Sequence, residues 1–460
     1  MGQYRHIGRR EFVSNAIAGA VLATAANGLH FAGRRPNVLF ILADDLGYGD
    51  LSCYGRPDYR TTNLDLLARQ GTRLTNAYSA SCVCTPTRCA FITGRYPARL
   101  SVGLEEPLKA KRDVGGRMGL PPEHPTVASL LKGNGYHTAL VGKWHLGYLP
   151  EFGPNRHGFD QFFGILSGAV DFFTHKDTSG EPDLHEDLVP VERIGYITDL
   201  LTERAVKLIL KPHKRPFYLS LHYTAPHWPW EGPGDEGVSR TLKKEYAGYT
   251  AGGSLKAFAA MMKSLDDGIG KVLKALRGAK VERDTLVIFT SDNGGERFSY
   301  NWPFSGQNGE LREGGLRVPA IIRWPGVIPA NGESSQVAIT MDWTATILAA
   351  TQTRADSNYP LDGEDLLLVI KGKLPAHART LFWRTEEQEA VRSGKWKYLK
   401  TDAKAEYLKM EAGTEYLFDL SLDQREQADF KEQHPDVLTQ LKEKLQKWNS
   451  QMLPRPNRQH

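Results

Sequence analysis

The chain has 460 residues, 40% of them hydrophobic, and its 58 Lys and Arg residues outnumber its 53 Asp and Glu residues by five. This length and composition predict a large hydrophobic core, divided between one large domain and a smaller one. So small a positive excess, without a basic stripe, gives no indication of nucleic-acid binding, and we expect no nucleic-acid partner.

The N-terminal residues have the pattern of an export signal. The pair Arg9 and Arg10 precedes an Ala-rich apolar run from Ala16 to Ala26, and small residues end that run. Zones in this order are typical of a twin-arginine-type signal, which we place at residues 1–33. The run is shorter than the ~18 residues that a membrane-spanning helix needs, so a stable membrane anchor is the less favoured alternative. We therefore predict a periplasmic or secreted protein.

Four apolar runs predict buried strands, because their hydrophobic residues are continuous instead of alternating with polar ones. These runs are Val38 to Ala43, His137 to Val141, Phe217 to His222 and Leu286 to Thr290. Helical stretches lie between them, at Asn63 to Gln70, Val127 to Lys132 and Leu255 to Arg277. This alternation predicts an α/β fold with a mostly parallel sheet, whose ligands gather at the carboxyl ends of the strands.

From about Ala376 the pattern changes to shorter strand-like runs followed by a helix. The runs are Thr380 to Arg384, Ala390 to Lys400 and Tyr416 to Leu420, and the amphipathic helix extends from Asp436 to Trp448. We predict a small C-terminal α+β domain with an antiparallel sheet at residues 376–460. The large domain, which is expected to hold the catalytic site, then covers residues 34–375.

The four cysteines all lie in the first fifth of the chain, at Cys53, Cys82, Cys84 and Cys89. A disulfide scaffold is not expected, because no later cysteine is present to pair across domains. A zinc site formed by Cys82, Cys84 and Cys89 is an alternative, but no CxxC pair and no second half-site support it. A chemical role for one of these cysteines is the favoured interpretation.

The segment Cys84-Thr85-Pro86-Thr87-Arg88 has the features of a helix start. Thr85 is suited to cap a helix and Pro86 to occupy its first position, which would place Cys84 at the helix N-terminus. Backbone N–H groups at such a position bind anions. Arg88 follows Cys84 by one helical turn, so its guanidinium is expected to reach an oxyanion or the side chain of residue 84.

This segment resembles the signature of the sulfatase family, in which C-x-P-x-R is followed by a Thr-Gly pair, here Thr93-Gly94. Other segments resemble further family blocks in family order, namely Asp44 to Asp50, Gly135 to His145, Ala225 to Pro229, Ser291 to Gly295 and Glu313 to Pro319. The chain is identified by these blocks as a member of the formylglycine-dependent, arylsulfatase-like sulfatases. The resemblance implies an alkaline-phosphatase-like α/β sandwich.

The same resemblance implies the cofactors. Cys84 would be oxidised to formylglycine by a formylglycine-generating enzyme during maturation. The implied ligands of a divalent cation are Asp44, Asp45, Asp292, Asn293 and the side chain at Cys84. Oxygen ligands of this kind favour Ca²⁺, with Mg²⁺ as the less favoured alternative, and argue against zinc.

It also implies catalytic roles. One hydroxyl of the hydrated aldehyde at residue 84 would attack sulfur while the cation and Arg88 neutralise the developing charge. His227, or Lys143 beside it, would protonate the leaving oxygen. His145 would take a proton from the second hydroxyl, so that the hemiacetal collapses and releases sulfate.

The sequence departs from the family pattern at Asn308, where counting back from Glu313 leads us to expect a sulfate-binding lysine. We treat Asn308 as a substrate-binding position together with Lys143 and His227, with Arg297 or Arg312 as alternative sources of the missing charge. A second departure, Cys82 in place of a small residue or proline, is expected to alter local packing only.

We therefore predict a sulfuric ester hydrolase that acts on a sulfated carbohydrate or an aryl sulfate. The alternatives are a phosphodiesterase or phosphonate hydrolase of the same superfamily, and a non-catalytic protein that binds sulfated glycans. The loop from Ser167 to His175 is expected to shape the pocket. The candidates for stacking on sugar rings are Phe172, Phe173, Trp228, Trp230 and Trp302, and we expect some of them to be core residues instead.

Overall fold

The computed structural model describes residues 35–111, 117–401 and 413–455, and the predicted export signal at residues 1–33 lies outside them. Its centre is a ten-stranded sheet in the order β11-β2-β10-β9-β1-β8-β4-β5-β6-β7. Five neighbouring strands, from β9 to β5, are parallel. Antiparallel pairs occur beside them, between β9 and β10 and between β5 and β6. The mostly parallel α/β sheet predicted from the sequence is thus confirmed.

Four of the five central strands agree with the predicted apolar runs, and β5 was not predicted. The five strands are β1 (Asn37–Ala43), β4 (His137–Lys143), β5 (Gln161–Ile165), β8 (Phe217–His222) and β9 (Thr285–Ser291). The outer strands are β2 (Thr72–Leu74), β6 (His185–Glu186), β7 (Val189–Pro190), β10 (Ala320–Arg323) and β11 (Gly332–Ser334). A separate pair joins β3 (Ala77–Tyr78) to β12 (Ala338–Ile339).

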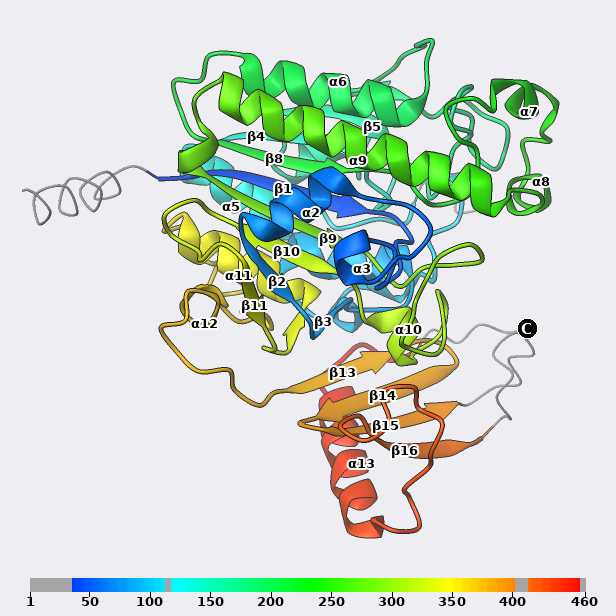
Figure 1. Ribbon diagram of the computed structural model, residues 1–460, viewed down its shortest axis with the longest axis vertical. Helices are drawn as coiled ribbons and strands as arrows, with labels where there is room; N and C mark the ends of the chain where they lie inside the picture. Colours follow the sequence, from blue (N-terminus) through cyan, green and yellow to red (C-terminus); the bar gives the residue numbers. More distant parts are fainter. Residues whose placement is uncertain (1–34, 112–116, 402–412, 456–460) are drawn as a thin grey trace, which may run out of the picture.

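Helices cover both faces of this sheet (Figure 1). Along β1, Leu39 and Ile41 point into one hydrophobic cluster and Val38 and Phe40 into another, as expected when successive side chains point to opposite faces. The first cluster packs under α2 (Thr62–Arg69), α6 (Ile197–Leu210) and α9 (Leu255–Gly278). The second packs under α3 (Cys84–Thr93), α5 (Val127–Gly133) and α11 (Thr340–Ala350). A strand buried on both faces therefore reads as a continuous apolar run.

The remaining described helices are short, apart from one at the C-terminus. They are α7 (Glu236–Thr241), α8 (Tyr246–Thr250), α10 (Glu313–Leu316), α12 (Leu367–Ile370) and α13 (Pro435–Asn449). Among the described residues, no helix combines the length and the apolar composition needed to cross a bilayer.

Strand β4 continues two residues beyond the predicted run and so brings Lys143 to the carboxyl edge of the sheet. The residue that permits this is Gly142, which has a φ of 118° and pairs with His222 on the next strand. A Cβ at this position would lie 1.7 Å from the carbonyl oxygen of His222. Only glycine allows so close an approach of the two strands.

The C-terminal residues form an antiparallel sheet of β13 (Thr380–Arg384), β14 (Gln388–Ser393), β15 (Trp396–Thr401) and β16 (Glu415–Asp419), packed against α13. This confirms the predicted small α+β region, here called the C-terminal unit. The expectation of one run from Ala390 to Lys400 was wrong. Gly394, with a φ of 61°, turns the chain there and divides the run into β14 and β15.

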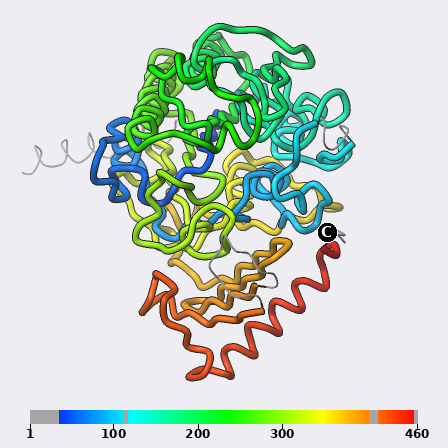
Figure 2. The backbone as a smooth tube through the Cα atoms, turned by 90° about the vertical axis from the view of Figure 1, so that its right-hand side faces the viewer, coloured from blue at the N-terminus to red at the C-terminus, as the bar shows by residue number. Residues whose placement is uncertain are grey.

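The C-terminal unit lies against the large sheet region, at the lower end of the molecule (Figure 2). A hydrophobic cluster joins Ala90 and Tyr96 of the large region to Trp383 and Leu445 of the C-terminal unit. Beside it lies a group of buried charged side chains around one tyrosine, which we call the interface ion cluster. Its members are Tyr78, Glu313, Arg317, Arg392, Lys397 and Glu426.

Candidate active site

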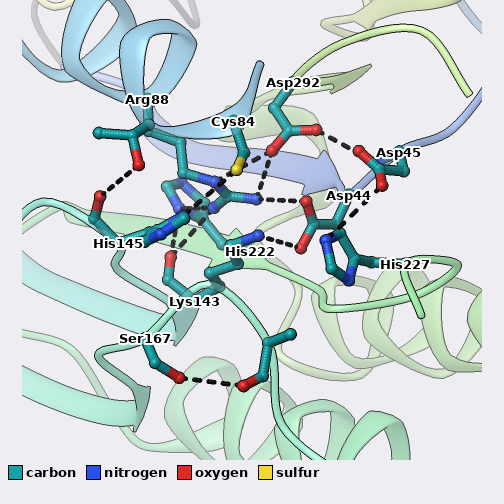
Figure 3. Close-up of polar contacts among 12 residues, drawn as sticks. Asp44, Asp45, Cys84, Arg88, Lys143, His145, Ser167, His222, His227 and Asp292 are labelled. Carbon is teal, nitrogen blue, oxygen red and sulfur yellow. Dashed lines mark hydrogen bonds and ion pairs between the residues drawn. The ribbon is translucent and has the colours of Figure 1, made fainter. Parts of the chain in front are cut away.

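Polar side chains from four strand ends and one helix start meet at the carboxyl edge of the parallel strands (Figure 3). Asp44 and Asp45 follow β1, Asp292 and Asn293 follow β9, and Lys143 ends β4. Because Ala43 of β1 is in register with Ser291 of β9, the two acidic segments leave the sheet side by side. The sequence-predicted residues are thereby brought together.

Cys84 is the first residue of α3, as expected from its sequence context. Its Sγ lies 3.3 Å from Nδ1 of His145. The other ring nitrogen of His145, Nε2, lies 2.9 Å from the carbonyl oxygen of Leu108. A carbonyl only accepts, so Nε2 carries the proton and Nδ1 is left to accept a proton from residue 84. His145 is therefore oriented as a base.

Burial sets the protonation states of this pair. It raises the pKa of the Cys84 thiol to about 12, so the unmodified thiol is protonated at neutral pH. Burial and the nearby Lys143 hold the pKa of His145 well below its ordinary value, which keeps the ring neutral. His145 also has a φ of 56°, a conformation that is rare for side chains of this size and that clusters at functional sites.

The prediction that Thr85 caps the helix was wrong. Helix α3 begins two residues earlier, at Cys84, and Val83 occupies the cap position without a side-chain hydrogen bond. The Thr85 hydroxyl instead donates to the carbonyl of His145 at 3.3 Å and accepts from the backbone N–H of Leu108 at 3.0 Å. It therefore ties the start of the helix to the loop that holds His145.

Arg88 is fully buried one turn along α3, and the hydrogen bonds of its guanidinium go to groups other than the residue-84 side chain, which was one of its two expected partners. Its Nε and Nη2 donate to Oδ2 of Asp292 at 3.0 and 2.7 Å, and its Nη1 donates to the carbonyl of Lys143 at 3.1 Å. Lys143 in turn donates from Nζ to Oδ2 of Asp44 at 2.7 Å. Both cations hold the acidic residues in place, instead of contacting residue 84 through a hydrogen bond.

These contacts have opposite effects on the two aspartates. Burial acts to raise the pKa of Asp44, but Lys143, His227 and Arg88 hold it below its ordinary value. Burial and the neighbouring Asp44 raise the pKa of Asp292 to about 6. The carboxylates therefore repel one another, and a cation between them would relieve that repulsion.

Three buried oxygens of the site have no hydrogen-bond donor, namely Oδ1 of Asp44, Oδ2 of Asp45 and Oδ1 of Asn293. Asn293 donates from Nδ2 to Oδ1 of Asp45 at 2.6 Å, so its amide oxygen is left for another partner. Buried acceptors without donors are rare in folded proteins. Carboxylate and amide oxygens are the ligands that Ca²⁺ and Mg²⁺ prefer, so this group of residues fits a hard divalent cation.

His227 and Asn308 both contact Asp45. Nδ1 of His227 lies 2.7 Å from the carbonyl oxygen of Trp228, and its Nε2 lies 3.6 Å from Oδ2 of Asp45. Asn308 donates from Nδ2 to Oδ1 of Asp45 at 2.6 Å. The structure thus places Asn308 at the site, where the sequence comparison with the family pattern led us to expect a cation.

Arg297 does not take the place of that cation. Its Nη1 donates to the carbonyls of Thr250 and Gly252 at 3.4 and 3.3 Å, and its guanidinium lies over the rings of Trp230 and Phe298. Among the contacts of the described residues, none joins Arg297 or Arg312 to the aspartates of the site, which are Asp44, Asp45 and Asp292.

Two residues near the site were not singled out from the sequence. His222, the last residue of β8, lies with Nδ1 3.1 Å from the carbonyl oxygen of Lys143 and with Nε2 2.8 Å from Oγ of Ser220. Its position at the end of a predicted strand could have marked it as a candidate site residue. The second is Gln388 in the C-terminal unit, and no feature of the sequence marked it as part of the site.

Gln388 holds the loop that carries Asn308. Its side chain, 1% exposed, accepts from the N–H of Leu311 and donates to the carbonyl of Gly309, both at 3.0 Å. On the other side of the loop, the N–H of Gly309 donates to the carbonyl of Cys82 at 2.9 Å. The C-terminal unit therefore contributes to the position of an active-site side chain.

The expected sugar-stacking aromatics have different environments. Phe172 and Trp230 are core residues, at 1% and 6% exposure, and Phe173 packs on Tyr196. Trp228 is partly buried beside His227, with ring centroids 4.3 Å apart. Trp302 is 51% exposed and lies under the guanidinium of Arg425. Phe172 and Trp230 are therefore the members of this set that belong to the core, and stacking on a sugar is excluded for them.

The family model described as Sulfatase matches residues 36–353, which is more than half of the chain. The chain belongs to the sulfatase family. The matched range contains every strand end that contributes to the site, and the family and its fold agree with those expected from the sequence. The protein is a sulfatase, an enzyme of sulfate-ester hydrolysis.

Relatives of known function and solved structures support this assignment. This sulfatase is 31% identical over 404 residues to N-acetylgalactosamine-6-sulfatase of Canis lupus familiaris, covering 82% of this chain and 74% of the relative. It is 35% identical over 413 residues to arylsulfatase A of Bos taurus, covering 80% and 75%. The crystal structure of Ps i-CgsB superposes with a TM-score of 0.80 at 29% identity, covering 92% of this chain and 94% of that one.

Proposed function

We propose that this sulfatase removes sulfate from a saccharide by means of a formylglycine made from Cys84 and a divalent cation, with Ca²⁺ favoured over Mg²⁺. The observation that carries the proposal is the position of residue 84. It lies at the start of a buried helix, 3.3 Å from a neutral histidine nitrogen that is free to accept a proton, and beside buried oxygens that lack donors.

The Sγ atom of Cys84 marks the position that the oxygen substituents of a formylglycine would take. A thiol here is a poor nucleophile, because it is buried and protonated. A hydrated aldehyde at residue 84 supplies two hydroxyls, one to attack sulfur and one whose deprotonation releases sulfate. Conversion of Cys84 requires a formylglycine-generating enzyme, which we propose as the maturation partner.

The residues that would hold the cation are Asp44, Asp45, Asp292, Asn293 and the modified residue 84. Three of them carry the donorless oxygens described above. A bound cation would supply positive charge beside the oxygens that become negative during sulfate transfer. Arg88 and Lys143 already fix the acidic residues from the inner side of the site, so the free oxygens are held in place before a ligand arrives.

We assign the two proton transfers to different histidines. His145 accepts a proton from a hydroxyl of residue 84 through Nδ1, the nitrogen that faces the Cys84 sulfur. His227 protonates the leaving oxygen through Nε2, because its Nδ1 is engaged by the carbonyl of Trp228. Lys143, buried and bonded to Asp44 at 2.7 Å, is better suited to remain a fixed cation.

A saccharide substrate is supported by the relatives. N-acetylgalactosamine-6-sulfatase is named for a sulfated sugar, and Ps i-CgsB has been solved in complex with k-i-k-neocarrahexaose. We extend this substrate class to the present enzyme, without naming the sugar or the ring position. Residues 1–33 would carry the enzyme to the periplasm or outside the cell, as their sequence predicts.

The test begins with the mass of the peptide that contains Cys84, after production with a formylglycine-generating enzyme. We expect the mass of the aldehyde, which is lower than that of the thiol. Steady-state rates on matched aryl sulfate and aryl phosphate esters then separate this reaction from that of a phosphodiesterase or phosphonate hydrolase. An unmodified thiol in a fully active enzyme, or a preference for the phosphate ester, would contradict the proposal.

A further inference from the structure

An exposed tyrosine lies beside the active site. Among the described residues, the exposed aromatic side chains are Trp302 and Tyr246, and Tyr246, the first residue of α8, is 66% exposed. The ring of Trp228 meets that of Tyr246 edge to face, with centroids 5.5 Å apart and planes at 88°. Trp228 also contacts the ring of His227. Tyr246 is therefore supported from behind by the residue that follows an active-site histidine.

The same tyrosine lines a cavity of about 430 Å³ together with Asn308. This volume lies within the ~300–1,000 Å³ that is typical of small-molecule sites. The cavity also reaches Val83, the residue before Cys84. Asn308 contacts Asp45 at 2.6 Å, so the cavity adjoins the proposed cation site. A group bound in the cavity would lie next to the group that carries the scissile sulfate.

The chemistry of the lining matches a sugar ring. Tyr246 and Pro107 provide apolar surface, while Glu106, Glu386 and Glu387 provide carboxylate oxygens. A pyranose combines a face of C–H groups with a rim of hydroxyls, and it can therefore contact an aromatic face while its hydroxyls bond to polar side chains.

We propose that Tyr246 forms a stacking subsite for the sugar ring next to the one that carries the scissile sulfate. The inference rests on the proposed function and makes it more specific, because it requires a substrate of at least two sugar rings. A single-ring aryl sulfate occupies only the catalytic centre and does not use the subsite.

The experiment compares two substrates in three variants. Steady-state kinetics are measured with 4-nitrophenyl sulfate and with whichever member of a panel of sulfated galactan and glycosaminoglycan oligosaccharides the wild-type enzyme turns over fastest. Tyr246→Ala should lower kcat/KM on the oligosaccharide by about tenfold, mainly through a higher KM, and should leave the aryl sulfate unchanged. Tyr246→Phe keeps the ring and should retain wild-type kinetics on both. Leu255→Ala, which removes another exposed apolar side chain, 58% exposed, is the matched control and should change neither.

The other outcomes overturn the subsite in distinguishable ways. An equal loss on both substrates in Tyr246→Ala would mean that the ring only supports Trp228 and His227. Unchanged oligosaccharide kinetics would show that the ring does not touch the substrate. Turnover of the aryl sulfate with no turnover of any oligosaccharide would remove the saccharide assignment and the subsite together, while the sulfatase chemistry at Cys84 would stand.

Discussion

Two groups of buried charges in this enzyme differ in how completely they are paired. In the interface ion cluster, Glu313 is bonded to Lys397 at 3.0 Å and to Arg317 at 2.8 Å, and Glu426 is bonded to Lys397 at 2.7 Å. In the active site, one oxygen of each of two aspartates has only a longer contact. Oδ1 of Asp44 lies 3.4 Å from Nη2 of Arg88 and Oδ2 of Asp45 lies 3.6 Å from Nε2 of His227, and neither oxygen accepts a hydrogen bond.

The difference separates a structural role from a binding role. A charged group inside a protein must be paired, because its desolvation is costly. The interface ion cluster meets this requirement with its own side chains and joins two parts of the chain. In the active site, buried acceptor oxygens remain without a hydrogen-bond donor. This indicates that their partner is a bound group that does not belong to the chain. Four predictions test this distinction, in order of decreasing effect.

The largest effect should follow loss of the nucleophile. Cys84→Ala should lower turnover of an aryl sulfate by more than about a thousandfold, because it removes the residue that we propose as the source of the attacking hydroxyl. The melting temperature should stay close to that of the wild type, since only one small side chain is shortened. Cys89→Ala, in the same buried helix, is the control and should remain active. Wild-type turnover in Cys84→Ala would refute the formylglycine assignment.

Breaking the interface ion cluster should act on stability instead. Lys397→Met leaves Glu426 without its ion-pair partner in a buried position, and the free energy of unfolding should fall by about 3–5 kcal/mol. Urea unfolding measures this change. The aryl sulfate kinetics of the protein that remains folded at low temperature should stay within a few-fold of the wild type. Unchanged unfolding would show that the cluster contributes nothing to holding the two parts together.

The active site should gain stability from a cation that the interface ion cluster does not need. Calcium at about 100 times its Kd should stabilise the enzyme by about 2.7 kcal/mol, and a chelator should reverse this gain and lower activity. Thermal melts with and without calcium measure the first effect. Asp292→Ala should not respond to calcium, and it should melt below the chelated enzyme because it also removes the main ion-pair partner of the buried Arg88. Equal melting and turnover with and without the cation would contradict the site.

The smallest of the four effects concerns Asn308. A lysine there would add a charge-assisted hydrogen bond to sulfate of about 1.5–3 kcal/mol, and Asn308→Lys should therefore raise kcat/KM on small aryl sulfates by roughly ten- to a hundredfold. It should also tighten inhibition by free sulfate. Arg297→Ala is the comparison, and it should change little because that arginine faces backbone carbonyls. A loss of activity in Asn308→Lys would mean that another cation already occupies the position.

The sequence predicted those parts of the structure that leave a local pattern. Continuous apolar runs identified the strands β1, β4, β8 and β9, and the polar residues at their ends identified Asp44, Asp45 and Asp292. Parallel strands end at one edge, so residues far apart in the chain could be expected at one site. The residue types alone did not assign catalytic or cation-binding roles. Those predictions came from the segments that resemble sulfatase signatures.

The parts that could not be predicted depend on contacts between distant segments. Gln388 bonds to backbone groups at Gly309 and Leu311, the latter 77 residues away, and no spacing or composition marks such a pair. Tyr246 could not be separated from core aromatics, because its exposure depends on how α8 lies on Trp228. The ion pair of Arg88 with Asp292 was not predicted either, because it joins residues 204 positions apart in the chain.

The two hydrogen bonds of Gln388 also limit how freely related enzymes could recombine. A chimera that takes its C-terminal unit from another sulfatase would lose the glutamine that holds the loop at Gly309 and Leu311, unless the donor carries an equivalent amide. The two units would then fold side by side with Asn308 displaced from Asp45. Residues 305–313 and β14 should therefore be taken from the same parent enzyme, although they belong to different regions of the fold.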